Sequence, residues 1–184
     1  MVLPVLSSDE NQSSLFSLRG SLDGAIEQEF TNRVQYIGVI IGREEFYLAI
    51  AAVAEIIMLQ PITYVSRANK FIEGVVNLRG TIMPAINLRK VLGVEKGQPS
   101  AATRIIIVKN DKNYELGFIV DSVTYVSSLA PSDVEAKVLY GDSSAAEVIS
   151  GIAKSQGKVI GILDEMKIIA RVCDNDGKKI SQAG

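Results

Sequence analysis

Residues 74–89 have the sequence GVVNLRGTIMPAINLR, and this stretch decides the fold class. Apolar side chains alternate along it, and Arg79 and Gly80 interrupt the pattern in the middle. Alternation of this kind is typical of strands, so the stretch predicts a hairpin whose strands are 74–78 and 81–87. Gly74 and Gly80 are expected to serve as turn residues, because no strand–glycine loop–helix unit that could hold a phosphate surrounds them.

Shorter apolar runs, separated by turn residues, lie on both sides of this hairpin. Such runs, rich in Val and Ile, predict short strands and hence a mainly β protein. The run 104–109 is apolar at consecutive positions, which predicts a strand buried on both faces. The other expected strands are 34–41, 45–50, 53–58, 114–121, 124–128, 148–153 and 158–163, with single helical turns at 67–72 and 88–92 and a short helix or strand at 164–170.

The hairpin is echoed later in the chain at one constant spacing. Gly151 and Gly157 stand in the second copy where Gly74 and Gly80 stand in the first, so they are expected to be turn residues as well. An internal duplication of this kind predicts two similar small barrels, each closing its own strand edges. A second match, at a slightly different spacing, pairs Ile50, Val53 and Ile56 with Val120, Val123 and Val126.

The composition argues against several classes of function. The 184 residues are 47% apolar and 22% charged, which suits a globular protein. The formal net charge is −2 without a long basic block, which argues against nucleic-acid binding. The chain has no histidine, so a Ser-His-Asp triad, a Cys-His pair and a histidine zinc site are excluded. The single cysteine, Cys173, excludes an internal disulfide and suits a reducing compartment.

Neither a metal site nor a membrane segment is expected. Asp121, Asp164 and Glu165 suggest a metal site only weakly, because they are spread along the chain and lack the spacing of a calcium loop. The apolar run 48–59 is interrupted by Glu55 and is too short to span a bilayer. We therefore expect no catalytic residue, no cofactor and no direct membrane insertion.

Several of these segments together resemble the CheW adaptor family of bacterial chemosensory arrays. The resemblance covers residues 34–172 and implies two intertwined five-stranded small β-barrels with short helices. The first barrel is expected mostly within 42–92, and the second mostly within 104–172 plus the first strand. Residues 1–33 are expected to be a flexible N-terminal extension, and 173–184 a C-terminal tail. The segments that carry the resemblance are 45–56, 71–89, 104–108, 117–123, 151–152 and 160–164.

The resemblance implies an adaptor rather than an enzyme. Its implied partners are the regulatory domain of a CheA-type histidine kinase and the cytoplasmic tip of a chemoreceptor, with rings of the adaptor and the kinase as a further implication. Such a protein is cytoplasmic and associates with the membrane through receptor arrays. Two alternatives stay open: an adaptor of another chemosensory pathway, such as twitching motility or second-messenger control, and a small ligand-binding barrel.

Four residues are candidates for partner contacts by this resemblance. Ile50, Val53 and Glu55 match positions that bind the kinase, and Glu55 and Arg79 match positions at the receptor and array contacts. We expect Arg79 to pair with Glu55; the alternative is two solvated charges. Ile50 and Val53 have opposite parity, so exposing both requires a bend near 51–52, and the alternative is ordinary core. The family usually has Asp where this chain has Asn87, so any role of a charge there is lost.

Overall fold

The computed structural model describes residues 33–109, 115–136, 145–155 and 157–177. The strands are β1 (Val34–Ile41), β2 (Glu44–Ala49), β3 (Val53–Met58), β4 (Ile72–Leu78), β5 (Thr81–Asn87), β6 (Arg104–Lys109), β7 (Glu115–Val120), β8 (Ser122–Leu129), β9 (Val134–Ala136), β10 (Ile149–Ser155) and β11 (Lys158–Leu163). The helices are α2 (Leu88–Leu92) and α3 (Glu165–Gly177), with short 3₁₀ turns at Ile50–Ala52, Pro131–Asp133 and Ala146–Val148. The mainly β class expected from the sequence is confirmed. The expected N-terminal extension lies almost wholly outside the described residues.

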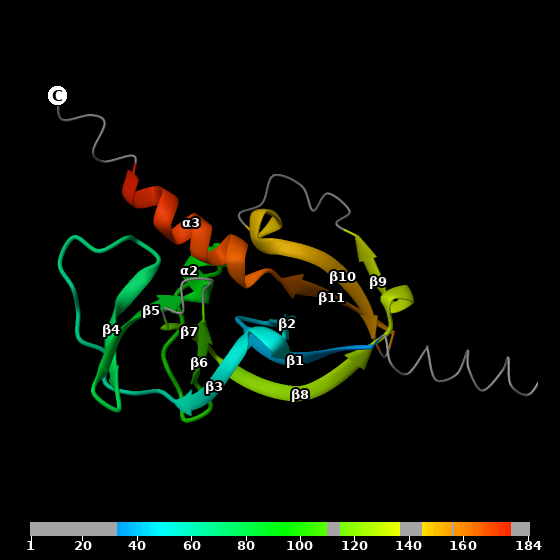
Figure 1. The fold of residues 1–184 in the computed structure, drawn as a ribbon, viewed down its shortest axis with the longest axis horizontal. Coiled ribbons are helices and arrows are strands. Elements are labelled where there is room, and N and C mark those ends of the chain that lie inside the picture. The colour runs from blue at the N-terminus through cyan, green and yellow to red at the C-terminus, as the bar shows by residue number, and fades with distance from the viewer. Residues whose placement is uncertain (1–32, 110–114, 137–144, 156, 178–184) are drawn as a thin grey trace, which may run out of the picture.

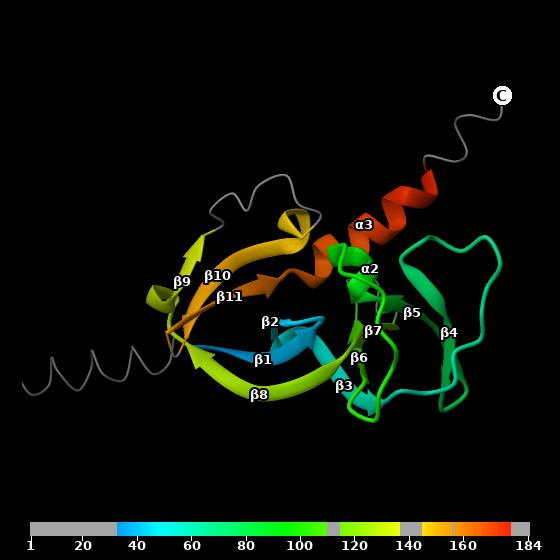
Figure 2. The same cartoon turned by 180° about the vertical axis from the view of Figure 1, so that it is seen from behind.

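Two curved sheets lie side by side, and α3 runs over the region where they meet (Figures 1 and 2). Within the described residues, one sheet has six strands in the order β8-β1-β2-β11-β10-β9, and the other has five in the order β3-β6-β7-β5-β4. The sixth strand is the short β9, which pairs with β10. The chain crosses between the sheets after β2 and again at Asp121, so the two sheets are intertwined as expected.

The division of strands between the sheets differs from the expected one. β2 lies beside β1 in the six-stranded sheet, whereas β6 and β7 lie in the five-stranded sheet with β3, β4 and β5. For β2 the reason is local, because a short connection turns β1 into β2 and the two strands form an antiparallel hairpin. The hairpin of β6 and β7 joins the five-stranded sheet through distant strands, since β6 pairs with β3 and β7 pairs with β5. The expected division splits the hairpin of β1 and β2, and it assigns the hairpin of β6 and β7 to the wrong sheet.

The two sheets repeat one topology. Five strands of the larger sheet, β8-β1-β2-β11-β10, match β3-β6-β7-β5-β4 position by position, and each set has one parallel pair, β11 with β2 and β5 with β7. The irregularity in β4 between Ile72 and Gly74 recurs in β10 between Ile149 and Gly151. An isolated bridge of Thr63 to β4 stands where β9 pairs with β10. The structure therefore supports the predicted internal duplication.

Both faces of the central strands are buried, because each sheet packs on the other and also curves around side chains of its own. On β6, Ile106 and Val108 join the core shared by the sheets and the helices, while Ile105 and Ile107 fill the inside of the five-stranded sheet. The burial of this strand on both faces, which the sequence predicts, is confirmed. In the six-stranded sheet, Tyr47 points to the inside cluster.

The helical segments follow from their end residues. The Asn87 side chain accepts a hydrogen bond from the Arg89 backbone N–H at 3.0 Å, and Gly93 ends α2 at φ 73°. Segment 164–170 is helical, because Asp164 Oδ1 caps α3 by accepting from the Lys167 backbone N–H. The helical turn expected at 67–72 is wrong. The buried Asn69 side chain bends this segment by bonding the Phe71 N–H and the Val172 carbonyl of α3.

The four glycines expected in turns fall into two groups. Gly80 and Gly157 adopt positive φ values of 88° and 73° in turns, as predicted. Gly74 and Gly151 instead lie within β4 and β10, so the turn expectation is wrong for both. They permit close approach of a neighbouring chain segment: a Cβ on Gly74 would overlap the Thr63 carbonyl oxygen.

A clamp formed by Arg89 and Asp121 holds the crossing point between the sheets. Arg89 donates from Nε and Nη2 to the Asp121 carboxylate, the shortest contact being 2.7 Å, and the Gly42 backbone N–H donates to the same carboxylate at 2.6 Å. The hydrogen bond to Asp121 raises the pKa of Arg89, against an opposing effect of burial. Asp121 thus has structural partners. Among the described residues, no group of three acidic or cysteine side chains could hold a metal.

Candidate functional site

The hairpin of β4 and β5 presents Arg79 beside Glu55 of β3. Arg79 Nη2 donates to Glu55 Oε1 at 2.8 Å, so the structure brings together the two residues that the sequence analysis pairs. Both side chains face solvent, with exposures of 76% for Arg79 and 36% for Glu55. An exposed pair of this kind contributes about 0–1 kcal/mol to folding. The pair is therefore a surface feature whose groups are accessible to another molecule.

The backbone of the hairpin fixes where Arg79 points. The Asn77 side chain accepts from the Gly80 backbone N–H at 2.9 Å and closes the turn. Arg79 itself lies in the left-handed region at φ 52°, which is uncommon for a residue other than glycine. The sequence analysis predicts a turn here, and the structure shows that Arg79 adopts the unfavourable left-handed backbone conformation within it.

A shallow hollow of ≈ 280 Å³ adjoins the ion pair. A second ion pair, Lys109 with Glu115 at 3.4 Å, also lines this hollow and was not anticipated from the sequence. Charges of both signs around a small hollow can receive complementary charges of a partner, but they offer no buried acid or base. The lining residues are Ala54, Glu55, Leu78, Arg79, Thr81, Ile107, Lys109 and Glu115.

Ile50 and Val53 lie where the chain bends into β3. A 3₁₀ turn covers Ile50–Ala52, and the Val53 backbone N–H donates to the Ile50 carbonyl, which supplies the bend that their opposite parity requires. Both side chains are half-buried and pack against the shared core. The sequence analysis offered partner contact or ordinary core for these two residues. Each side chain has a part that packs on the core and a part that is exposed.

Three exposed apolar side chains of the five-stranded sheet were not among the sequence candidates. Met58 is 69% exposed, Ile82 is 70% exposed and Ile56 is 38% exposed. For β3, the sequence could have predicted this exposure, because alternation along the strand places Ile56 and Met58 on the face opposite Glu55. The duplicated topology relates Ile56 to Val126 and Ile82 to Val159, and these two are also exposed. Each sheet thus carries a related apolar surface.

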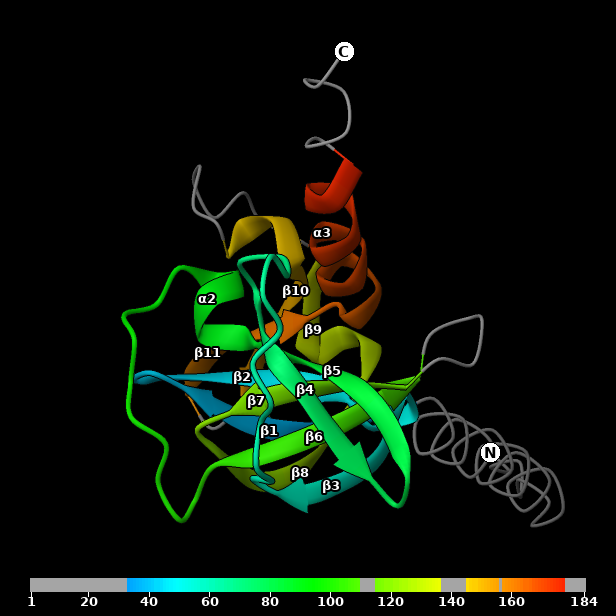
Figure 3. The ribbon, with the colours of Figure 1, turned by 90° about the vertical axis from the view of Figure 1, so that its left-hand side faces the viewer.

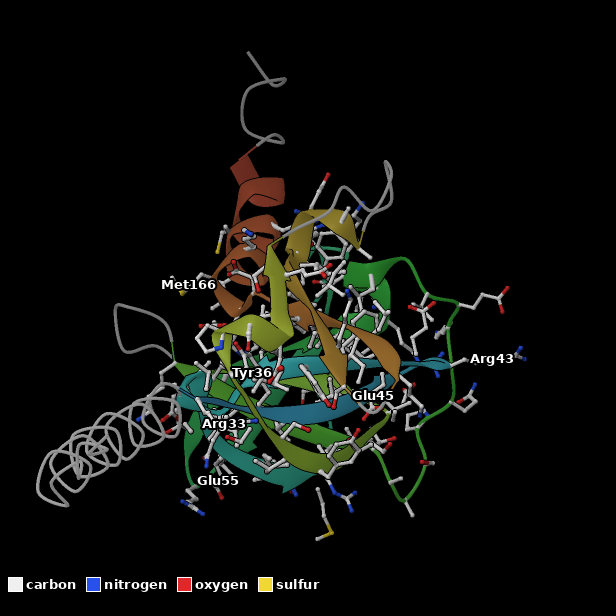
Figure 4. The ribbon with its side chains drawn as sticks, turned by 90° about the vertical axis from the view of Figure 1, so that its right-hand side faces the viewer. Arg33, Tyr36, Arg43, Glu45, Glu55 and Met166 are labelled. Atoms are coloured by element: carbon white, nitrogen blue, oxygen red, sulfur yellow. The ribbon has the colours of Figure 1, made fainter. Side chains whose placement is uncertain are left out.

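A larger hollow of ≈ 880 Å³ lies beside β2, β11 and the end of α2. Its lining combines apolar side chains with the charges of Arg43, Glu44, Glu45 and Lys158. In Figure 4, Arg43 and Glu55 extend on opposite sides of the molecule, so the two hollows are separate surfaces. The apolar lining is Ile40, Phe46, Leu92, Val94, Ala145, Ile149, Val159 and Ile160, together with Gly93 and Gly161.

The Asn87 side chain has a local role that aspartate could not fill. Its Nδ2 donates to Glu73 Oε2 at 3.1 Å, and Lys90 forms an ion pair with the same oxygen at 2.8 Å. The hydrogen bond from Lys90, with that from Asn87, lowers the pKa of Glu73 against the opposing effect of burial. A carboxylate at position 87 would lack the N–H that donates to Glu73 and would repel its negative charge. The asparagine amide avoids this repulsion.

The sequence of this chain is similar to proteins of one family. The model of the CheW-like domain matches residues 35–173. The chemotaxis protein CheW of Thermotoga maritima is 34% identical over 119 residues, which cover 63% of this chain and 74% of that protein. The chemotaxis protein CheW of Helicobacter pylori is 28% identical over 158 residues, covering 85% and 94%.

A solved structure agrees with this assignment. The scaffolding protein TtCheW of Thermoanaerobacter tengcongensis superposes with a TM-score of 0.67 at 32% identity, covering 72% of this chain and 89% of that one. The domain match extends from the second residue of β1 into α3, and so it includes both sheets and the Glu55–Arg79 pair. The chain belongs to the CheW family.

Proposed function

We propose that this protein is a non-catalytic chemotaxis adaptor that couples chemoreceptors to a CheA-type histidine kinase. The observation that carries the proposal is the exposed pair of Glu55 on β3 with Arg79 on the hairpin of β4 and β5, in a chain of the CheW family. The similar proteins are named chemotaxis proteins and a scaffolding protein, and the family resemblance implies kinase and receptor contacts at these positions.

The duplicated sheets suit an adaptor because they provide more than one surface on one rigid body. The shared core joins both sheets to α2 and α3, so partners held at different places on this body keep a fixed relation to each other. Holding two partners together raises the effective concentration of each at the other and ties receptor geometry to the kinase. We assign the kinase surface to Ile50, Val53 and Glu55, and the receptor and array contacts to Glu55 and Arg79.

Exposed apolar side chains and the charged pair lie on different faces of β3, and each offers a different kind of contact. Ile56, Met58 and Ile82 expose apolar area on the five-stranded sheet, and each such side chain contributes about 1.5–3 kcal/mol when fully buried. Glu55 and Arg79 supply charges that set orientation and discriminate between partners. Since an exposed pair adds little to folding, we assign it a role in recognition of a partner.

The proposed location is the cytoplasm, at the membrane through receptor arrays. Among the described residues, no helix is long and apolar enough to cross a membrane. Contact with the membrane would then come through the receptors rather than through this chain.

The test is reconstitution with purified parts. The full chain is mixed with a kinase regulatory domain and a soluble receptor-tip fragment, and complexes are resolved by size-exclusion chromatography with light scattering. We expect a ternary complex that forms only when the adaptor is present. Failure of the adaptor to bind either fragment would overturn the proposal.

A further inference from the structure

The connection between β3 and β4, residues 59–71, carries the most exposed aromatic side chain among the described residues. Tyr64 is 78% exposed, and its neighbour Val65 is 39% exposed. Figure 3 shows this connection crossing in front of the five-stranded sheet, and Figure 1 places it at the end of the molecule far from the start of β1. It is not among the residues assigned to the kinase or receptor surfaces above.

This connection is anchored at both ends. Thr63 and Val75 exchange two backbone hydrogen bonds of 2.8 Å, and the lack of a side chain at Gly74 allows that approach. Further along, the buried Asn69 bonds the Val172 carbonyl of α3 at 2.5 Å and the Phe71 N–H at 3.0 Å. Tyr64 is thus displayed from a segment with defined geometry, so binding through it orders little additional chain.

The exposed part of the connection is positively charged. Arg67 and Lys70 are both exposed, and residues 59–72 contain no Asp or Glu. Lys70 lies 4.9 Å above the ring centroid of Phe71, and neither cation forms an ion pair within the part of the chain that the structure describes. The nearest carboxylate along the chain, Glu73, is bonded to Lys90. The connection thus carries two exposed cations and the exposed Tyr64 ring, and neither cation has an ion-pair partner among the described residues.

The backbone at Arg67 gives a second, independent indication. Among the described residues, positive φ outside glycine occurs at Arg67 (64°) and Arg79 (52°) alone. Asn or Gly adopts this conformation at lower cost than arginine. A costly conformation that the fold sustains points to a function of the side chain. At Arg79 that function is already proposed, and Arg67 shares the feature at a separate place.

We propose that residues 62–70 form a second docking surface, which binds an acidic segment of a partner protein. The partner's carboxylates pair with Arg67 and Lys70, and an apolar side chain beside them packs against Tyr64 and Val65. A protein segment fits better than an anionic lipid surface, because the anchored backbone presents few cations in a fixed geometry rather than a broad basic patch. This proposal does not depend on kinase or receptor coupling through Glu55 and Arg79.

The test uses nuclear magnetic resonance of the ¹⁵N-labelled full chain. The probe is a short synthetic peptide of Glu and Asp with one Leu and one Phe, compared with the same peptide carrying Gln and Asn in place of its acids. We expect shifts of amides within 63–71 with the acidic peptide only, and an affinity that falls by about tenfold or more between about 50 and 500 mM salt. Tyr64→Ala and Lys70→Gln should each weaken binding by about fivefold.

Arg67→Asn separates recognition from folding. The variant removes the charge and suits the left-handed backbone, so we expect weaker peptide binding with an unchanged or higher urea midpoint. Lys154→Gln, an exposed lysine on β10, is the matched control and should bind like the wild type. Arg79→Ala should leave peptide binding unchanged, which keeps this result distinct from the reconstitution above.

Four results would overturn the proposal. They are equal shifts with the neutral peptide, shifts confined to other residues, wild-type affinity in Arg67→Asn and Lys70→Gln, or binding only to vesicles containing about 30% phosphatidylserine.

Discussion

Replacing Asp121 by alanine is expected to destabilise this protein more than any exposed ion pair does, because it releases the clamp where the chain crosses between sheets. The carboxylate accepts from Arg89 at 2.7–3.1 Å and from the Gly42 N–H at 2.6 Å. Hydrogen bonds to charged groups contribute about 1.5–3 kcal/mol each. The side chains are 21% and 29% exposed, so water replaces part of what is lost. The expected cost is about 2–4 kcal/mol, less than the sum of the bonds.

The assay is urea unfolding of the full chain at neutral pH, followed by circular dichroism. Asp121→Asn keeps the shape and one acceptor, so it should cost about half as much as Asp121→Ala. Lys154→Ala, which breaks the exposed pair with Glu135, is the matched control and should cost about 0–1 kcal/mol. If Asp121→Ala costs no more than this control, the clamp does not hold the crossing and the reasoning is wrong.

Three further predictions concern other parts of the fold. Asn87→Asp places a carboxylate beside Glu73, so it should lower the urea midpoint at pH 7; because acid protonates these groups, the difference should shrink as the pH falls through the lowered pKa of Glu73. The hydrogen bond with Tyr47 is the main cause that raises the pKa of Tyr125 to about 12 from an ordinary value of 10.0. Folding should therefore lose stability as the pH rises from 10.0 to about 12, and Tyr125→Phe should reduce that loss in alkaline unfolding curves. Gly74→Ala should destabilise by about 1–3 kcal/mol through overlap with the Thr63 carbonyl, whereas equal stability in thermal unfolding would show that the connection moves aside freely.

The sequence-based predictions that proved correct rest on patterns within a few adjacent residues. Alternation and a glycine at the interruption were enough to predict the hairpin of β4 and β5, because strand period and turn conformation are properties of a few adjacent residues. The consecutive apolar residues of β6 likewise revealed burial on both faces. The pairing of Glu55 with Arg79 was proposed with help from the family resemblance, and the structure shows the contact.

The expectations that failed depend on contacts between distant parts of the chain. Gly74 lies in a strand because the Thr63 carbonyl approaches it, and no neighbouring residue signals that approach. Residues 67–72 were expected to be helical, but Asn69 is drawn towards Val172, a residue of α3. The strands β6 and β7 lie in the five-stranded sheet because they pair with β3 and β5, and the periodicity within a strand does not say which strands it pairs with.

The central claim is that Glu55 contacts the kinase, and that Arg79, through its ion pair with Glu55, holds this surface in one shape. Its most direct test is isothermal titration calorimetry of a purified kinase regulatory domain with the wild type, Glu55→Ala, Arg79→Ala and the Lys154→Ala control. We predict that each of the first two variants weakens binding by about tenfold, equivalent to about 1.4 kcal/mol, while its free energy of unfolding changes by about 1 kcal/mol or less. Wild-type affinity in both variants, with wild-type binding intact, would contradict the account.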